Sequence, residues 1–192
     1  MLNLSSKKRV ILVGLESVGK TSLFACLTQN RAGEETNVKG STIFVKEQTV
    51  NGCTFVDTPG IRLNDNEVFG DVQNEMAKAD HVFIVVRGTH YNQETQLLLP
   101  LIKQDTNSIS LVITFADRMN GTNKSSFKKQ LKDGDLPVTF INSRKASEKD
   151  RQLLIKSIGN GISFRHVVET LSKIKLTPTL PKETWFERQF LG

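Results

Sequence analysis

The sequence has few cysteines, a single tryptophan and no long apolar run. Its 192 residues include two cysteines, Cys26 and Cys53, so a disulfide framework is excluded and a reducing compartment is the simpler expectation. No stretch of about 18 apolar residues occurs, so nothing in the given sequence is expected to span a bilayer. The first nine residues lack the apolar stretch of a signal peptide. With 38% apolar and 24% charged residues, the composition favours a packed globular domain.

Positive charge is concentrated in the second half of the chain. The net charge is +6, and residues 121–175 hold 12 basic and 5 acidic side chains, a local excess of +7. Three interpretations stay open: a solvated lysine-rich face, an anionic membrane surface, or nucleic acid. Nucleic acid is not expected as a partner, because no aromatic residues are interleaved with these charges to stack on bases.

Short apolar runs alternate with helical patterns along the chain. Runs without polar alternation predict strands buried on both faces, and strands that alternate with helices predict a mostly parallel sheet. Asn51-Gly52 predicts a hairpin, which adds one antiparallel edge strand. The expected fold is α/β, a six-stranded sheet with helices on both faces. The expected strands are 10–13, 42–50, 53–57, 81–86, 110–115 and 138–141, and the expected helices are 20–29, 67–78, 93–103, 125–132, 147–158 and 162–174.

The composition changes after residue 175. Residues 1–175 are expected to form one nucleotide-binding domain, and residues 176–192 a linker and an amphipathic tail. Pro178 and Pro181 cannot continue a helix, while Trp185, Phe186 and Phe190 are costly to leave in water. The tail could pack on its own domain, join a second copy as a homodimer, or lie at a membrane interface before a further domain.

Residues 14–21 match the phosphate-loop pattern G-x-x-x-x-G-K-[ST] in full, between an apolar strand and an amphipathic helix. The loop N–H groups and the helix N-terminus are expected to hold the phosphates of a nucleotide. Lys20 is expected to reach the β- and γ-phosphates, and Thr21 to offer its hydroxyl to Mg²⁺. The expected nucleotide-binding residues of this segment are Gly14, Ser17, Val18, Gly19, Lys20, Thr21 and Ser22.

A second motif, D-T-P-G at residues 57–60, follows a predicted strand. Asp57 at a strand end is expected to hold Mg²⁺, and Gly60 allows a backbone N–H to approach the γ-phosphate. A D-T-P-G sequence alone could be an ordinary turn, since proline and glycine favour one. Its position after a phosphate loop favours a metal and switch motif.

The order of these motifs resembles the translation-factor-type GTPases over about residues 8–175. Within that class, the motifs are most similar to the cytosolic G domain of ferrous-iron transport protein B. This resemblance implies a P-loop GTPase (Ras-like) fold, GTP or GDP as the ligand, and Thr42 as a second Mg²⁺ ligand. It also implies a catalytic role for Lys20, Thr42 and Gly60. The segments that carry the similarity are 19–24, 37–42 and 57–61.

Three positions depart from the pattern of that family. Ser17 replaces an asparagine that helps to bind K⁺, so K⁺ activation is not expected. The base-reading motif N-x-x-D is here 114–117. The resemblance implies that Asp117 accepts the guanine N–H donors, with Thr114 in the supporting position. Ser143 lies in a final loop that matches only loosely. The stretch 162–192 is expected to be too short to contain the helical regulatory domain that this family generally has.

The resemblance implies a slow GTPase switch that regulates an attached ferrous-iron transporter at the cytoplasmic face of the membrane. Hydrolysis is expected to be slow, because Ile61 follows Gly60 and cannot orient a water. Arg62 is expected to be an ordinary surface residue more often than a catalytic arginine. The AIG1-type immune-associated GTPases are a second resemblance, through D-T-P-G and residues 140–142. They imply a cytoplasmic GTPase whose nucleotide state controls self-assembly.

Overall fold

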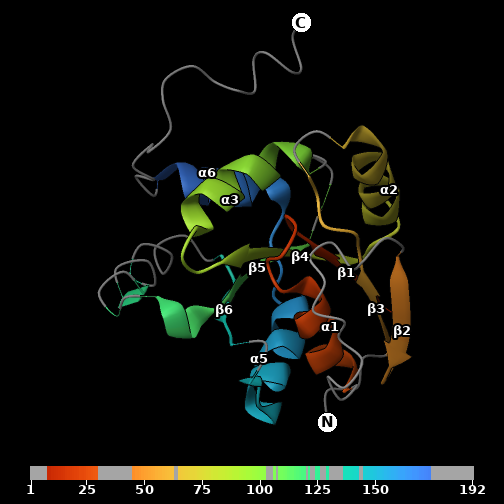
Figure 1. Ribbon diagram of the computed structural model, residues 1–192, viewed down its shortest axis with the longest axis horizontal. Helices are drawn as coiled ribbons and strands as arrows, with labels where there is room; N and C mark the ends of the chain where they lie inside the picture. The colour runs from red at the N-terminus through yellow and green to blue at the C-terminus, as the bar shows by residue number, and fades with distance from the viewer. Residues whose placement is uncertain are drawn as a thin grey trace, which may run out of the picture.

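The computed structural model describes residues 8–29, 45–62, 65–102, 106, 108–119, 121, 124, 125, 129, 136–142 and 145–173 (Figure 1). Thr42, Ser143 and the tail 176–192 lie outside these residues, so the expectations about them stay predictions. The same holds for most of the expected helix 125–132.

A six-stranded sheet forms the centre of the fold, in the order β2-β3-β1-β4-β5-β6. Only β2 runs antiparallel to its neighbour, and all other pairs are parallel. The turn between β2 and β3 has left-handed angles at Asn51 (φ 50°) and Gly52 (φ 81°), as the Asn-Gly pair predicts. The sheet therefore confirms the expected α/β architecture. Its strands are β1 (Lys8–Val13), β2 (Lys46–Val50), β3 (Cys53–Asp57), β4 (His81–Arg87), β5 (Ile109–Thr114) and β6 (Val138–Phe140).

Helices cover both faces of the sheet (Figure 1). One apolar cluster joins α1 and α5 to the sheet, and another joins α2, α3 and α6 to the opposite face. Among the described helices, none is long and apolar enough to cross a membrane. The helices are α1 (Lys20–Thr28), α2 (Asn66–Met76), α3 (Tyr91–Leu98), α5 (Glu148–Ile158) and α6 (Phe164–Lys173), with 3₁₀ turns η1 (Leu99–Leu101) and η2 (Ala116–Arg118).

Strand β1 shows how the two cores are divided. Val10 and Leu12 face the cluster under α1 and α5, whereas Ile11 and Val13 face the other cluster. All four side chains are buried, because alternate residues of a central strand point to opposite covered faces. The strand that leads into the phosphate loop is thus held rigidly from both sides.

Most expected bounds agree with the observed ones within two residues, and the expected helix 93–103 differs most. The expected helix 93–103 is wrong in its second half, since α3 ends at Leu98 and a 3₁₀ turn containing Pro100 follows. Pro100 has no backbone N–H and therefore cannot donate the hydrogen bond that would continue the α-helix. Of the expected strand 42–50, the structure describes residues 45–50, and of these Lys46–Val50 form the strand while Val45 does not.

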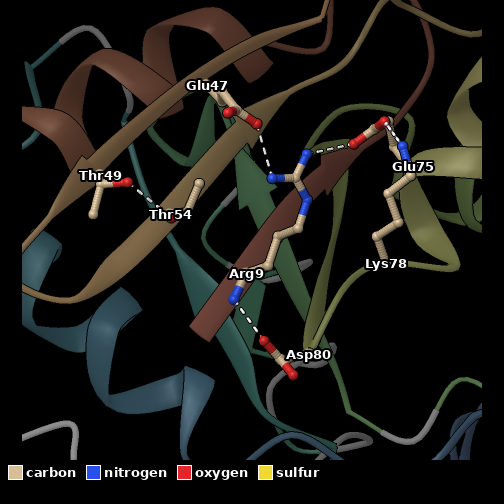
Figure 2. Close-up of polar contacts among 7 residues, drawn as sticks. All are labelled: Arg9, Glu47, Thr49, Thr54, Glu75, Lys78 and Asp80. Atoms are coloured by element: carbon tan, nitrogen blue, oxygen red, sulfur yellow. Dashed lines mark hydrogen bonds and ion pairs between the residues drawn. The ribbon is translucent and has the colours of Figure 1, made fainter. Parts of the chain in front are cut away.

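A polar cluster fastens the end of α2 to the sheet (Figure 2). The Arg9 guanidinium on β1 pairs with Glu47 on β2 at 2.8 Å and also with Glu75 on α2. The Arg9 backbone N–H donates to Asp80 Oδ2 at 2.7 Å, and Lys78 Nζ pairs with Glu75 at 2.7 Å. These contacts raise the pKa of Arg9, mainly through Glu75, and lower that of Glu75. The C-terminal end of α2 is therefore anchored beside the first strand.

Candidate functional site

The phosphate-loop sequence forms the connection from β1 to α1, at the carboxyl edge of the parallel strands. Ser17 and Gly19 have left-handed angles, with φ 62° and 92°. Such a turn directs successive N–H groups into one concave surface that attracts anions. At Gly14, an added Cβ would lie 2.4 Å from the Val85 carbonyl oxygen, so only glycine allows the loop to pack against β4. This cradle and the N-terminus of α1 fit a phosphate group.

The side chain of Lys20 lies under this loop and is 6% exposed. Its Nζ donates hydrogen bonds to the carbonyl oxygens of Gly14 (3.1 Å) and Leu15 (3.0 Å). Burial lowers the pKa of Lys20 to about 8, and the nearby carboxylates of Asp57 and Glu16 oppose this shift. The lysine is therefore a cation at neutral pH, held beside the loop N–H groups.

Thr21 and Asp57 meet although they come from different elements. Thr21, in the first turn of α1, donates its hydroxyl to Asp57 Oδ2 at 2.8 Å. Asp57 ends β3 and is fully buried. A hydroxyl and a carboxylate beside a phosphate cradle are the hard oxygen ligands that Mg²⁺ prefers, so the donor set fits this ion. The two expected metal ligands of the described residues are thus brought together.

The D-T-P-G segment runs directly alongside the phosphate loop. Ile61 N–H donates to the Gly14 carbonyl at 3.1 Å, and Glu16 N–H donates to the Ile61 carbonyl at 3.2 Å. At Gly60, an added Cβ would lie 2.6 Å from Glu16 Cα, so the close approach requires glycine. Thr58 Oγ1 donates to the Leu12 carbonyl at 2.7 Å and anchors the segment to β1. The two motifs therefore form one surface.

An ion pair that the sequence did not reveal crosses this junction. Arg62 Nε lies 2.9 Å from Glu16 Oε2, and a second guanidinium nitrogen lies 3.3 Å from Oε1. The partners are 46 residues apart. The only signal in the sequence is their opposite charge, one inside the phosphate loop and one just after D-T-P-G.

The expected base-reading motif begins where β5 ends. Thr114 is fully buried, and its Oγ1 lies 2.6 Å from the Val18 carbonyl and 3.1 Å from the Val86 carbonyl. Phe115 then has a left-handed φ of 51°, which turns the chain into η2. Asp117 lies exposed on η2. The threonine thus contacts the phosphate loop directly, and the carboxylate after it faces outward.

A buried carboxylate completes the surroundings of the lysine. Glu94 on α3 is 2% exposed, accepts the Arg87 backbone N–H at 2.6 Å and pairs with the Arg87 guanidinium. It also raises the pKa of Lys20. Sequence analysis missed Glu94, because an acidic residue on an amphipathic helix is ordinarily solvated. Among the described residues, no group of three or more histidines, cysteines or acidic residues forms a metal cluster.

Comparisons with known proteins identify relatives of this chain. The model of the 50S ribosome-binding GTPase family matches residues 9–115, more than half of the sequence. The GTP-binding protein EngB of Prosthecochloris aestuarii is 26% identical over 172 residues, which cover 83% of this chain and 90% of EngB. The GTPase Der of Wolinella succinogenes is 31% identical over 120 residues, which cover 57% of this chain and only 25% of Der.

Solved structures share the fold. NFeoB of S. thermophilus bound to GDP.AlF4⁻ has a TM-score of 0.61 at 22% identity, over 80% of this chain and 64% of that one. Era in complex with MgGDPNP and a 16S ribosomal RNA segment has a TM-score of 0.62 at 18% identity. The match covers 81% of this chain and 56% of the Era chain. At such identity these likenesses show the P-loop GTPase fold alone, so membership in the iron-transport family is not confirmed. The match of the family model, together with the identity to EngB and Der, shows that the chain is a GTPase of the 50S ribosome-binding GTPase family.

Proposed function

We propose that this chain is a switch that binds GTP or GDP with Mg²⁺ and changes its partner contacts as GTP is hydrolysed. The observation that carries the proposal is the contact between Thr21 and Asp57 at 2.8 Å, beside the cation of Lys20. It places hydroxyl, carboxylate and ammonium groups at one phosphate cradle, the arrangement that phosphoryl transfer uses.

Each expected residue has a role in this proposal. The phosphate-loop residues hold the phosphates through backbone N–H groups, and Lys20 balances their charge. Thr21 and Asp57 would hold Mg²⁺, which would neutralise negative charge on the phosphates when bound. Thr42 as a further ligand, Ser143 near the base and Asp117 as the guanine reader remain part of the proposal.

Hydrolysis is proposed to be slow in the isolated chain. Ile61 is buried, and both its N–H and its carbonyl are bonded to the phosphate loop. The isoleucine side chain has no hydrogen-bonding group with which to orient an attacking water, and the two backbone groups are already used. The chain therefore depends on switch backbone or a partner to accelerate the reaction.

Calorimetry on the whole chain tests this proposal. GDP should bind far more tightly than ADP, and removal of Mg²⁺ with a chelator should weaken GTP binding. Lys20→Ala should lose both nucleotides and hydrolysis while the fold survives, as circular dichroism would show. Equal affinity of the wild type for GDP and ADP would contradict the proposal.

For the partner, we propose the large ribosomal subunit. The description of the family supports it, and so does the basic excess of residues 121–175. The expectation of no nucleic-acid partner rested on the lack of stacking aromatics. Lysine and arginine can bind backbone phosphates without stacking, so a ribosomal particle remains compatible with these charges. Purified 50S subunits should pellet the chain more strongly with a GTP analogue than with GDP, and 30S subunits serve as the control.

A regulatory role beside a ferrous-iron transporter is the second candidate. The G domain of FeoB from Methanococcus jannaschii supports it, since that structure is covered to 98% at a TM-score of 0.53. A place at the cytoplasmic face of the membrane belongs to this candidate alone. Nucleotide-dependent pelleting with 50S subunits would favour the first candidate. Restored iron uptake in cells that lack their transporter's G domain would favour the second.

A further inference from the structure

The phosphate loop carries an acidic side chain beside the position of a negatively charged ligand. Glu16 is the third residue of the loop 14–21. Burial lowers the pKa of Lys20, and the Glu16 carboxylate partly opposes this lowering, so the two charges share one electrostatic environment. A carboxylate at this place repels a phosphate, and the repulsion is stronger beside a protein than in bulk water.

The repulsion concerns the terminal phosphate most. The backbone of Gly60 lies against Glu16 Cα, where an added Cβ would come within 2.6 Å. The Gly60 N–H is the group proposed to meet the γ-phosphate, which GTP has and GDP lacks. The negative charge of Glu16 is therefore expected to weaken the binding of GTP more than the binding of GDP.

Arg62 is placed to cancel this charge. Its guanidinium meets the Glu16 carboxylate with two nitrogens, at 2.9 and 3.3 Å, and a planar fork matches a carboxylate well. The backbone also fixes the pair, because neighbouring Ile61 is bonded on both sides to the phosphate loop. The side chains of Arg62 and Glu16 are 56% and 30% exposed. Because water screens such an exposed ion pair, it contributes little to folding stability.

We propose that Arg62 sets the preference of the site for a nucleoside triphosphate over a diphosphate by neutralising Glu16. The inference rests on the proposed nucleotide-binding function and adds a specificity determinant to it. Arg62 is a positioning residue, which acts through the Glu16 carboxylate and not by touching the phosphate. Without Arg62, the Glu16 carboxylate would be an uncompensated negative charge in the phosphate loop, next to the segment that holds Gly60.

Four variants of the whole chain test the inference: Arg62→Ala, Arg62→Lys, Glu16→Gln and the double variant Arg62→Ala/Glu16→Gln. Calorimetry with GDP and a non-hydrolysable GTP analogue gives the affinity ratio for each. Arg62→Ala should weaken analogue binding by about tenfold and GDP binding by about twofold or less. Arg62→Lys should keep most of the preference, because it keeps the positive charge. The double variant should recover the wild-type ratio.

Lys78→Ala is the matched control. Lys78 is 61% exposed and pairs with Glu75 at 2.7 Å, so its loss removes one exposed ion-paired cation away from the loop. Its affinity ratio should equal that of the wild type. Melting curves without nucleotide show whether each variant is folded, and Arg62→Gln replaces Arg62→Ala if the latter is not.

Two results would overturn the inference while leaving the proposed function intact. One is an equal effect of Arg62→Ala on both nucleotides. The other is a loss that Glu16→Gln fails to repair, which would mean that Arg62 contacts the phosphate itself. If instead the wild type bound neither nucleotide, the proposed function itself would be wrong.

Discussion

The hydroxyl of Thr114 lies 2.6 Å from the carbonyl oxygen of Val18, 96 residues earlier in the chain. This contact links the end of β5, where the base-reading motif begins, to the phosphate loop. A threonine hydroxyl has one proton, so the Val18 and Val86 carbonyls share a single donor. The Thr114 side chain is shorter than the asparagine of the N-x-x-D motif, but it still reaches the phosphate loop.

We expect Thr114→Val to weaken nucleotide binding by about fivefold or more, because the valine methyl cannot donate to the Val18 carbonyl. Losing a buried hydrogen bond should also cost about 1–3 kcal/mol of unfolding free energy. Ser110→Ala is the matched control. Ser110 lies on the same strand and donates to the Ser157 carbonyl at 3.1 Å, away from the loop. It should lower stability without changing nucleotide affinity in calorimetry.

We expect Asp117→Ala to remove much of the preference for guanine over adenine nucleotides. The carboxylate is exposed on η2, where it can accept both guanine N–H donors. The loss should be about 1–3 kcal/mol, measured as the ratio of GDP to ADP affinities. An unchanged ratio would assign base selection to another group.

The stability of the nucleotide-free chain should rise between about pH 8 and about pH 10.5 through Lys20. Its folded pKa, about 8, lies below the ordinary 10.5, so over this range the unfolded state binds the proton that the folded state has lost. Below pH 8 the lysine is charged in both states, and its burial costs stability. The difference in unfolding free energy between the wild type and Lys20→Met should change by on the order of 3 kcal/mol across this range.

Nucleotide affinity should have the opposite dependence on pH. Above about pH 8 the free chain has a neutral Lys20, so GDP binding must first restore its proton and becomes weaker. Calorimetry from pH 7 to 9 measures the decline. Lys20→Met should bind weakly at every pH in this range, and any slope that it shows belongs to other groups.

Turnover should show no K⁺-specific acceleration. Ser17 is exposed with a left-handed φ of 62°, and it replaces the asparagine that supports K⁺ in the iron-transport family. Hydrolysis rates in KCl and NaCl at equal ionic strength should agree. A large advantage of KCl would mean that Ser17 or loop carbonyls suffice as ligands.

The features that could be predicted from the sequence are those determined by residues close together in the chain. Asn51, Gly52 and Gly19 have left-handed backbone, which their residue types tolerate, so the hairpin turn and the bend of the phosphate loop were predictable from local sequence. Buried strands that alternate with helices predicted the mostly parallel sheet, but they do not determine its strand order. The two expected metal ligands Thr21 and Asp57 lie in contact at 2.8 Å, and their role as ligands stays a prediction.

The missed features depend on the tertiary fold. Nothing in the separation of Glu16 from Arg62, or in the helical pattern around Glu94, indicates that these charges find partners. The early end of α3 was missed for another reason, since the apolar periodicity continues through Pro100 although the helix does not. Thr42 and Ser143 lie outside the described residues, so their roles remain predictions.

The ion pair at the C-terminal end of α2 determines which part of this helix would move if the D-T-P-G segment shifted. Glu75, near the last residue of α2, is fixed to Arg9 on the central sheet, whereas the helix begins at Asn66, a few residues after the junction at Arg62. The buried side chains of Val72 and Met76 also hold the middle and last turns of the helix against the sheet. A shift of the D-T-P-G segment would therefore be largest at the first turn of α2 and smallest at Glu75. The outer surface around Glu67 and Asp71 is then where a partner would sense which nucleotide is bound.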